Sequence, residues 1–330
     1  MSQTKALSMF NNLLQQAAEA LSPQSLLRGL GMPVLGILGF LMLWQVAATQ
    51  IHTSLGSLPG PAEVSAQAGN LWADYREEQV RAAEFIAMQE ERNERILEQN
   101  PDREVRIRPY SGSTTFVHQI GTSLGTVISG FLLASLIAIP LGILVGLNRH
   151  LYAAINPVIQ VFKPVSPLAW LPIVTLVVSA TYTSDDPMFS RAFVTSMITV
   201  SLCSLWPTLV NTIQGVNSVS QDLRNVSQVL RLPFLTHVWK VVLPSAIPMI
   251  FTGMRLSLGI AWMVLIAAEM LAQSPGLGKF IWDEFQNGSS DSLARIMVAV
   301  IAIGLIGLLL DRGMLTLQRL LSWDKASATH

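Results

Sequence analysis

The sequence predicts an all-α, polytopic membrane protein with six transmembrane helices and one charged helical insertion. Its mean hydropathy is +0.46, and only 13% of its 330 residues are charged. Several stretches of about 20 residues are almost free of charge, which is the length that crosses a hydrocarbon core of about 30 Å. The charges gather between Asp74 and Arg108, which indicates a single solvated segment.

The charge balance and the cysteine count exclude several classes of protein. The net charge is zero and the pI is about 7.0, so the chain lacks the basic face that a nucleic-acid partner requires. The single cysteine, Cys203, excludes an internal disulfide and a zinc site built from cysteines, and we expect it to be a packing residue. The sequence has no H-E-x-x-H motif and no P-loop. We therefore expect no bound metal or cofactor, and no ATP hydrolysis by this chain.

Apolar stretches divide the chain into six predicted spans. Residues 1–32 are predicted to be a cytoplasmic amphipathic lead-in and not a signal peptide, because the first apolar run begins only at Pro33. The first span covers 33–50, residues 51–117 form the insertion, and 321–330 are a cytoplasmic tail. The core, 118–320, holds five further spans, predicted over His118–Leu147, Leu151–Ala180, Met188–Ile213, Ala246–Leu271 and Leu293–Gln318.

Six spans place both termini on one side of the membrane, and the basic residues indicate which side. Lys and Arg flank spans mainly on the cytoplasmic face. The short loops around Asp185-Asp186 and Asp283-Glu284 are mostly acidic. Both termini and the segment Val219–Val242 are therefore predicted to be cytoplasmic, and the insertion external. The basic residues on the terminal side are Lys5, Arg28, Arg149, Arg224, Arg231, Lys240, Arg312, Arg319 and Lys325.

The insertion is charged on most of its faces. Leu71–Asn100 consists mainly of good helix formers, and Pro101 ends the pattern. Such a segment is usually a solvated helix or hairpin packed on the membrane domain. A docking surface for a soluble partner is the alternative, and the sequence does not separate the two.

Ionisable residues inside spans are expensive in lipid and mark candidate sites. Lys163 lies in the third span, where four prolines break the helical pattern, and broken helices are tolerated only beside protein or a water-filled cavity. Arg255 and Glu269 share the fifth span about 21 Å apart, so they do not pair with each other. Each of these two is expected to line a pathway, to pair with another span or to reach water; their positions favour the last two roles.

Residues 121–125 read GTSLG and match the hydrolase pattern G-x-S-x-G, with Ser123 as nucleophile. That pattern needs a strand before the serine, whereas here it opens a membrane span. The alternative is a stripe of small residues that lets helices approach closely. We prefer helix packing for Gly121, Gly125, Ser129, Gly142 and Gly146.

A polar, helix-prone segment, Val219–Pro248, separates the fourth and fifth spans. A loop that only reconnected two spans would need a few residues. Here apolar residues recur at near-helical spacing over about 25 residues, with basic residues among them. We interpret the segment as a docking element for a cytoplasmic partner. Its apolar positions are Leu223, Val226, Val229, Leu230, Leu235, Val238 and Val242.

This segment carries a resemblance to a known family, whose pattern is E-A-A, a Gly about five residues later, and then I/V-x-L-P. Asn225-Val226-Ser227 stands at the E-A-A, Arg231 at the Gly, and Val241–Pro244 closes the pattern. LPGPAEV, KPVSPLAWLPI, FTGMRLSLGIAWMVLIAAEM and GLGKFIWDEFQ fit as well. The chain resembles the membrane-spanning permease of type I ATP-binding-cassette importers, in the nitrate/sulfonate/taurine branch. The N-V-S variant is similar to nitrate and cyanate permeases in particular.

The resemblance implies the type I permease fold and two sets of functional residues. The loop that couples the permease to the ATPase would span 219–243. Its implied contact residues are Asn225, Val226, Ser227, Val229, Leu230, Arg231, Leu232, Pro233, Leu243 and Pro244. Lys163, Arg255, Trp262 and Glu269 are the candidates for lining the translocation pathway.

The resemblance also implies partners and a cargo. We expect a multi-pass protein of the bacterial inner membrane, paired with a second permease, two cytoplasmic ATPases that hold ATP and Mg²⁺, membrane lipid, and a periplasmic or lipid-anchored binding protein. The cargo would be a small inorganic anion, nitrate or nitrite first, with bicarbonate, cyanate, taurine or an alkanesulfonate as alternatives. An ion-coupled secondary carrier would predict internal repeats and paired acids within spans, and neither occurs.

Overall fold

The structure is a computed structural model that describes residues 31–53, 56–100, 104–183, 189–289 and 291–321. The predicted lead-in 1–32, the tail 321–330 and the loop at Asp185-Asp186 lie almost wholly outside these residues. The predicted all-α fold is confirmed. In the described part, helices account for nearly all the regular structure, and the exception is one two-stranded ribbon, β1 (His52–Thr53) with β2 (Gly56–Ser57).

The first span is α3 (Met32–Gln50), close to the predicted 33–50. Nearly all of its side chains are exposed in the chain, as expected of a helix that faces lipid. Trp44 near its end donates a hydrogen bond from Nε1 to the carbonyl of Pro59 at 3.1 Å. This bond ties the end of α3 to the start of the insertion.

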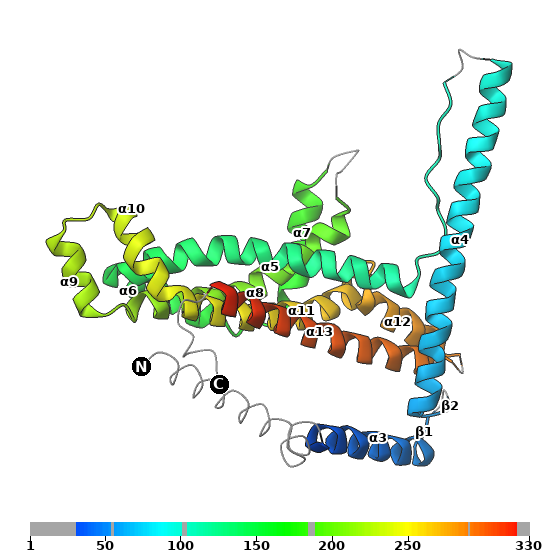
Figure 1. The fold of residues 1–330 in the computed structure, drawn as a ribbon, viewed down its shortest axis with the longest axis horizontal. Helices are drawn as coiled ribbons and strands as arrows, with labels where there is room; N and C mark the ends of the chain where they lie inside the picture. Colours follow the sequence, from blue (N-terminus) through cyan, green and yellow to red (C-terminus); the bar gives the residue numbers. More distant parts are fainter. Residues whose placement is uncertain (1–30, 54–55, 101–103, 184–188, 290, 322–330) are drawn as a thin grey trace, which may run out of the picture.

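Four long helices form the bundle in Figure 1: α5 (Phe116–Leu147), α8 (Arg191–Asn217), α11 (Leu243–Ala272) and α13 (Ser292–Leu321). Helices α5 and α8 run in the same direction, because Gly130 packs on Val200 and Gly146 packs on Val216, so the residue numbers rise together along the contact. Helix α11 runs against both of them and against α13. The ends of α3 and α13 that lead to the two termini point towards the same end of the bundle (Figure 1).

Small residues explain the close packing of α5 on α8. A Cβ on Gly142 would lie 2.7 Å from Cβ of Thr212, so only glycine fits there. The packing predicted for Gly142 and Gly146 is therefore confirmed. The same prediction for Gly121 and Gly125 is wrong within this chain, since no described side chain or neighbouring backbone lies within 4 Å of a Cβ built on either. These two glycines lie on a face of α5 that no other described helix covers.

The third span is broken, as the prolines predicted. It consists of α6 (Arg149–Phe162) and α7 (Pro167–Thr181), whose axes differ by 100°. Pro164 and Pro167 lie at the break, and Asn148 and Ser166 cap the two helices with their side-chain oxygens. Since α5 and α8 are parallel, the chain must cross back between them. The bent pair is that crossing, and together with the five long apolar helices it gives six.

Three short elements follow α8: α9 (Gln221–Val229), α10 (Phe234–His237) and a π-helical turn, η2 (Val238–Val242). The fifth span begins earlier than the predicted Ala246, because α10, η2 and α11 run on as 39 residues. Helix α12 (Leu277–Asn287) then packs on α11 and α13 at the opposite end of the bundle.

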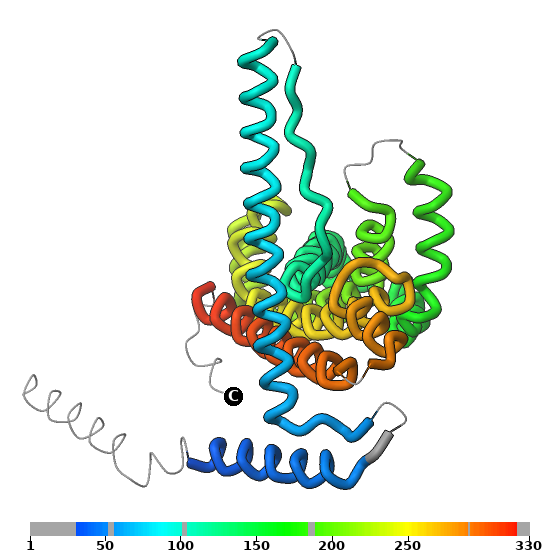
Figure 2. The backbone as a smooth tube through the Cα atoms, turned by 90° about the vertical axis from the view of Figure 1, so that its right-hand side faces the viewer, coloured from blue at the N-terminus to red at the C-terminus, as the bar shows by residue number. Residues whose placement is uncertain are grey.

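The main element of the insertion is one helix, α4 (Pro61–Gln99), which lies across the ends of the spans and projects beyond them (Figures 1 and 2). Its first half packs on α13 and α5. Residues 104–115 return beside it, and the side chain of Gln89 pairs with both backbone groups of Arg108, at 2.8 and 3.0 Å. The solvated helix packed on the membrane domain is therefore present. A docking role for it stays a prediction.

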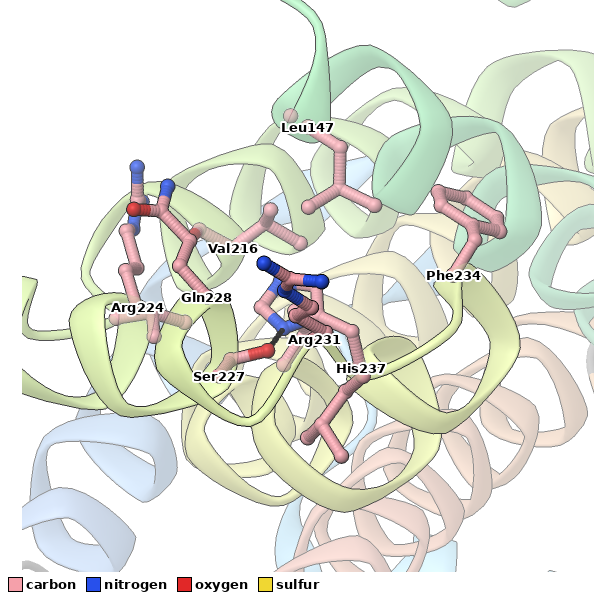
Figure 3. Close-up of a pocket in the computed structure, with 12 residues that line it drawn as sticks. Leu147, Val216, Arg224, Ser227, Gln228, Arg231, Phe234 and His237 are labelled. Atoms are coloured by element: carbon pink, nitrogen blue, oxygen red, sulfur yellow. Dashed lines mark hydrogen bonds between the residues drawn. The ribbon is translucent and has the colours of Figure 1, made fainter.

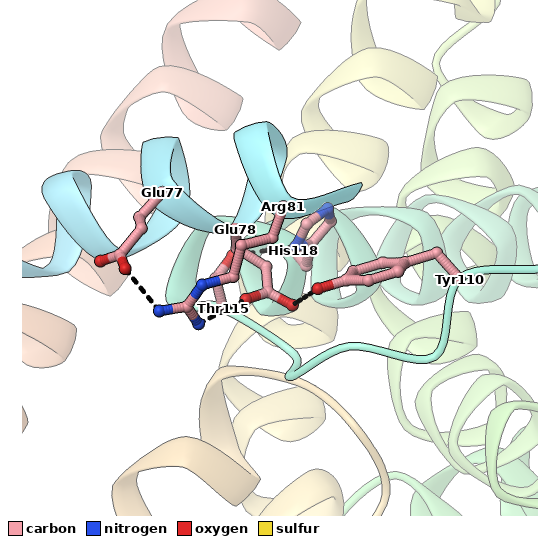
Figure 4. Close-up of polar contacts among 6 residues, drawn as sticks. All are labelled: Glu77, Glu78, Arg81, Tyr110, Thr115 and His118. Atoms are coloured by element: carbon pink, nitrogen blue, oxygen red, sulfur yellow. Dashed lines mark hydrogen bonds and ion pairs between the residues drawn. The ribbon is translucent and has the colours of Figure 1, made fainter. Parts of the chain in front are cut away.

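Polar side chains fasten the returning segment 104–115 to α4 (Figure 4). The hydroxyl of Tyr110 donates to Oε1 of the buried Glu78 at 2.9 Å. Arg81 forms ion pairs with Glu77 and Glu78. The hydrogen bond to the Glu78 carboxylate raises the pKa of Tyr110.

Candidate coupling and translocation sites

Helix α9 exposes a continuous apolar ridge at the end of the bundle where the termini point. Val229 is 82% exposed, Leu230 64% and Val226 55%, and Phe234 and Leu235 of α10 extend the ridge. Exposing apolar side chains to water costs free energy. An exposed apolar ridge bounded by polar residues is therefore typical of a protein interaction site. We call Leu223, Val226, Val229, Leu230, Phe234 and Leu235 the coupling ridge.

Helix α9 ends in a left-handed residue. Arg231 has φ +45°, Leu232 N–H donates to the carbonyl of Ser227, and Arg231 N–H donates to that of Gln228. This is the Schellman arrangement, which glycine usually occupies because a Cβ costs about 1 kcal/mol there. This left-handed turn explains why the family pattern has a glycine at the corresponding position. In this chain Arg231 adopts the same turn and adds a guanidinium.

The opposite face of α9 is polar and turns towards the bundle (Figure 3). Arg224 donates from Nη2 to the carbonyls of Val216 and Asn217 at 3.1 and 3.3 Å, which caps the end of α8. The buried Ser227 Oγ lies 2.7 Å from Nδ1 of His237. A cavity of about 460 Å³ lies between this face and the ends of α5 and α8.

The other predicted coupling residues lie nearby. Asn225 is exposed and its Oδ1 accepts from Gln221 at 3.1 Å. Leu232 and Pro233 connect α9 to α10, and Leu243 and Pro244 open α11. All ten therefore belong to one end of the bundle, although Ser227 is turned inward and does not belong to the coupling ridge.

The four predicted pathway residues do not gather at one site. Lys163 is exposed at the break between α6 and α7, and no described side chain pairs with it. Arg255 forms a bidentate ion pair with Asp311 of α13, with Nε–Oδ1 at 2.5 Å and Nη2–Oδ2 at 2.9 Å. Trp262 is buried and donates from Nε1 to the carbonyl of Ile303 at 3.0 Å. Arg255 and Trp262 therefore join α11 to α13.

Glu269 is the most buried of the four, with 1% of its surface exposed. Its Oε1 accepts from the hydroxyl of Ser123 at 2.8 Å, and its Oε2 accepts from the N–H of Gly278 at 2.9 Å. The same Ser123 oxygen accepts from the N–H of Leu277. The carboxylate thus fastens the start of α12 to α5 and α11. Sequence reasoning missed this cluster, although the G-L-G that follows Glu269 was a signal for close backbone approach.

Ser123 does not have the surroundings of a hydrolase nucleophile. It is fully buried inside α5, the described residues 104–115 directly before that helix form no strand, and its neighbours are a carboxylate and backbone groups. The hydrolase alternative therefore has no support in the described residues. Ser123 is a structural residue.

Replacing Ser123 by Ala is expected to lower the free energy of unfolding by about 1–3 kcal/mol, because it leaves the Leu277 N–H and one side of Glu269 unpaired. The measurement is thermal unfolding of the purified chain. Ser129→Ala is the matched control: its hydroxyl bonds only to the carbonyl of Gly125 in its own helix, so little change is expected. Equal stability of the two variants would contradict the role given to Ser123.

Residues 138–322, more than half of the chain, match the family of binding-protein-dependent transport system inner membrane components. The chain belongs to this family. It is a multi-pass permease subunit of an ATP-binding-cassette importer, as the coupling motif predicted. The family places such a subunit in the inner membrane beside a separate ATPase and a binding protein.

Relatives carry two cargo names. The bicarbonate transport system permease protein CmpB of Synechococcus elongatus is 36% identical over 89% of this chain and 90% of its own length. The nitrate import permease protein NrtB of Synechocystis is 40% identical over 61% and 68%. An inward-facing structure of the MetNI methionine ABC transporter aligns with TM-score 0.55 at 13% identity, covering 62% of this chain and 95% of that one. At that identity the likeness concerns the fold alone.

Proposed function

We propose that this permease forms the translocation pathway for a small inorganic anion and is driven by an ATPase that grips the coupling ridge. The exposed ridge carries the proposal, because five of its apolar side chains are more than half exposed at one end of the bundle. A P-loop is missing from the sequence, so the energy must come from another subunit.

The proposed assembly has two copies of this chain, two cytoplasmic ATPases and an external binding protein. Residues 219–243 and both termini would be cytoplasmic, and the insertion 51–117 would lie outside with the acidic end of α12. ATP would bring the two ATPases together and with them the coupling ridges. The spans would then alternate between inward- and outward-facing states, because a rigid bundle transmits the movement of one end to the other.

Nitrate is our first choice of cargo and bicarbonate the second. The relatives support both, since permeases named for each ion match this chain at 33–40% identity. The N-V-S form of the coupling motif at 225–227 favours nitrate. Both ions are planar monoanions with three oxygens, so a pathway suited to one differs from a pathway suited to the other in fine geometry.

Lys163 is the pathway residue that the structure supports best. It is a cation at a break in the third span, without an acidic partner among the described residues, and it remains available to an anion. Arg255 is neutralised by Asp311, and Glu269 would repel an anion. We propose that these two, with Trp262, shape the pathway by holding α11 in place.

The test is uptake into proteoliposomes that contain this chain, its ATPase and its binding protein. Nitrate uptake is expected only when ATP is supplied on the side of the membrane that carries the ATPase. Uptake of labelled bicarbonate tests the second choice of cargo. Lys163→Gln is expected to slow uptake at least tenfold with unchanged ATPase assembly, whereas Arg149→Gln, an exposed cation at the start of α6, should not. Uptake by the permease alone would refute the proposal.

A further inference from the structure

Helix α9 has an apolar face that is exposed and a polar face that turns towards the bundle. Arg224, Ser227 and Gln228 follow the spacing i, i+3, i+4 and share one face of α9, and Arg231 follows at the left-handed turn beyond its end. All four line the 460 Å³ cavity towards the bundle. Of the coupling ridge, only Phe234 also lines this cavity, and its other five side chains lie outside it. A protein on the ridge therefore leaves this cavity free.

The cavity is concave, basic and bounded by apolar walls. The ends of α5 and α8 contribute Leu147, Val216 and Val219, and α10 contributes Phe234. Two guanidiniums face the cavity, and none of the described residues that line it is Asp or Glu. Uncompensated positive charge between low-dielectric walls concentrates the local field and attracts anions.

Hydrogen-bond donors remain available in the cavity. The guanidinium of Arg231 has no hydrogen-bond or ion-pair partner in the described part of the chain, and Figure 3 shows it in the midst of the residues that line the cavity. Arg224 uses Nη2 for the carbonyls at the end of α8, and its other nitrogens have no described partner. The planar fork of a guanidinium suits an oxyanion, which accepts two parallel hydrogen bonds from it.

We propose that this cavity binds one oxyanion, held by Arg231 and Arg224 with Gln228 as an additional donor. The anion is a free phosphate-like ion or the phosphate of a lipid headgroup. All of its proposed ligands lie on residues 224–231, so it stiffens the segment that carries the coupling ridge. This site is separate from the proposed translocation pathway, and it adjoins the coupling ridge, with which it shares Phe234.

The test uses the full chain purified in maltoside micelles, which contain no phosphate. In one arm, sodium phosphate is titrated against sodium chloride at equal ionic strength. In the other, phosphatidylglycerol is added against the same amount of phosphatidylcholine. The readout is the unfolding temperature, which rises when a ligand binds only the folded state. We expect a rise of about 2 °C or more in at least one arm.

Three variants identify the site. Arg231→Gln is expected to raise the half-saturating concentration about tenfold, since it removes charged hydrogen bonds. Gln228→Glu places a carboxylate beside the arginines and should abolish the rise with Arg231 intact. Lys240→Gln removes an exposed charge from η2, outside the cavity, and should respond like the natural chain.

The outcomes separate the two sources of the anion and the failure of the proposal. A rise in the phosphate arm that Arg231→Gln and Gln228→Glu weaken assigns a free anion. A rise confined to phosphatidylglycerol, with the same dependence, assigns a lipid headgroup. No rise in either arm, or equal responses of Arg231→Gln and Lys240→Gln, overturns the proposal. None of these measurements requires transport, so they stand apart from the uptake assay.

Discussion

Replacing Val229 by Pro is expected to abolish ATP-driven uptake while membrane insertion and folding of the bundle stay normal. Val229 is the last residue of α9 and the most exposed member of the coupling ridge. Proline there removes the N–H that bonds one turn back and pushes its ring against the carbonyl of Asn225, at a cost of about 3 kcal/mol to the helix. It also drives Gln228 out of helical geometry. The ridge would lose its shape.

The matched control is the same substitution at the other end of the same helix. Gln221 is the first residue of α9, where proline is tolerated because that N–H has no helical partner. Ser220 before it already has φ −59° and ψ 147°, which suit a residue before proline. Gln221→Pro should keep most of the uptake. Both variants are tested by uptake in vesicles and by co-purification of the ATPase. Equal uptake by the two variants would show that the coupling ridge is not required for transport.

Replacing Gly278 by Ala is expected to detach α12 from the bundle. A Cβ at this position would lie 2.2 Å from the carbonyl oxygen of Ile266 and 2.8 Å from Cβ of Glu269. Backbone atoms cannot move aside as a flexible side chain can, so we expect the free energy of unfolding to fall by about 3 kcal/mol. The N–H that Glu269 accepts would move away with it. The measurement is thermal unfolding together with the yield of monodisperse protein.

Gly304→Ala is the control for this experiment. Gly304 lies inside α13, and no described side chain or neighbouring backbone lies within 4 Å of its Cβ position. Alanine there should change stability by less than about 1 kcal/mol, since it favours the helix slightly. If Gly278→Ala unfolds at the same temperature as Gly304→Ala, then the close approach of α12 to α11 is not a requirement of the fold.

The order and type of the helices could be predicted because they rest on local properties. Lipid demands about 20 apolar residues for each crossing, prolines interrupt a helix wherever they occur, and the charged insertion cannot enter a membrane. The apolar spacing of Val219–Pro248 likewise predicted the short helices between the fourth and fifth spans. Each of these properties is carried by neighbouring residues, so the chain need not be folded for it to be recognised.

The partners of individual side chains could not be predicted in the same way. Ser123 and Glu269 are 146 residues apart, and Arg255 and Asp311 are 56 apart. The stripe at Gly121 and Gly125 has the same spacing as the one at Gly142 and Gly146, yet only the second packs on α8. Identical spacing has different consequences because the tilt and rotation of each helix depend on all of its neighbours.

By itself, therefore, the sequence determined the apolar stretches, the break in the third of them and the amphipathic segment between the fourth and the fifth, since the cost of placing each residue in lipid or water is local. Only the tertiary structure decided that Arg255 is neutralised by Asp311, that Glu269 holds α12, and that Arg231 takes a left-handed turn into a basic cavity. Those outcomes depend on which helix faces come together, and that arrangement minimises the free energy of the whole bundle at once.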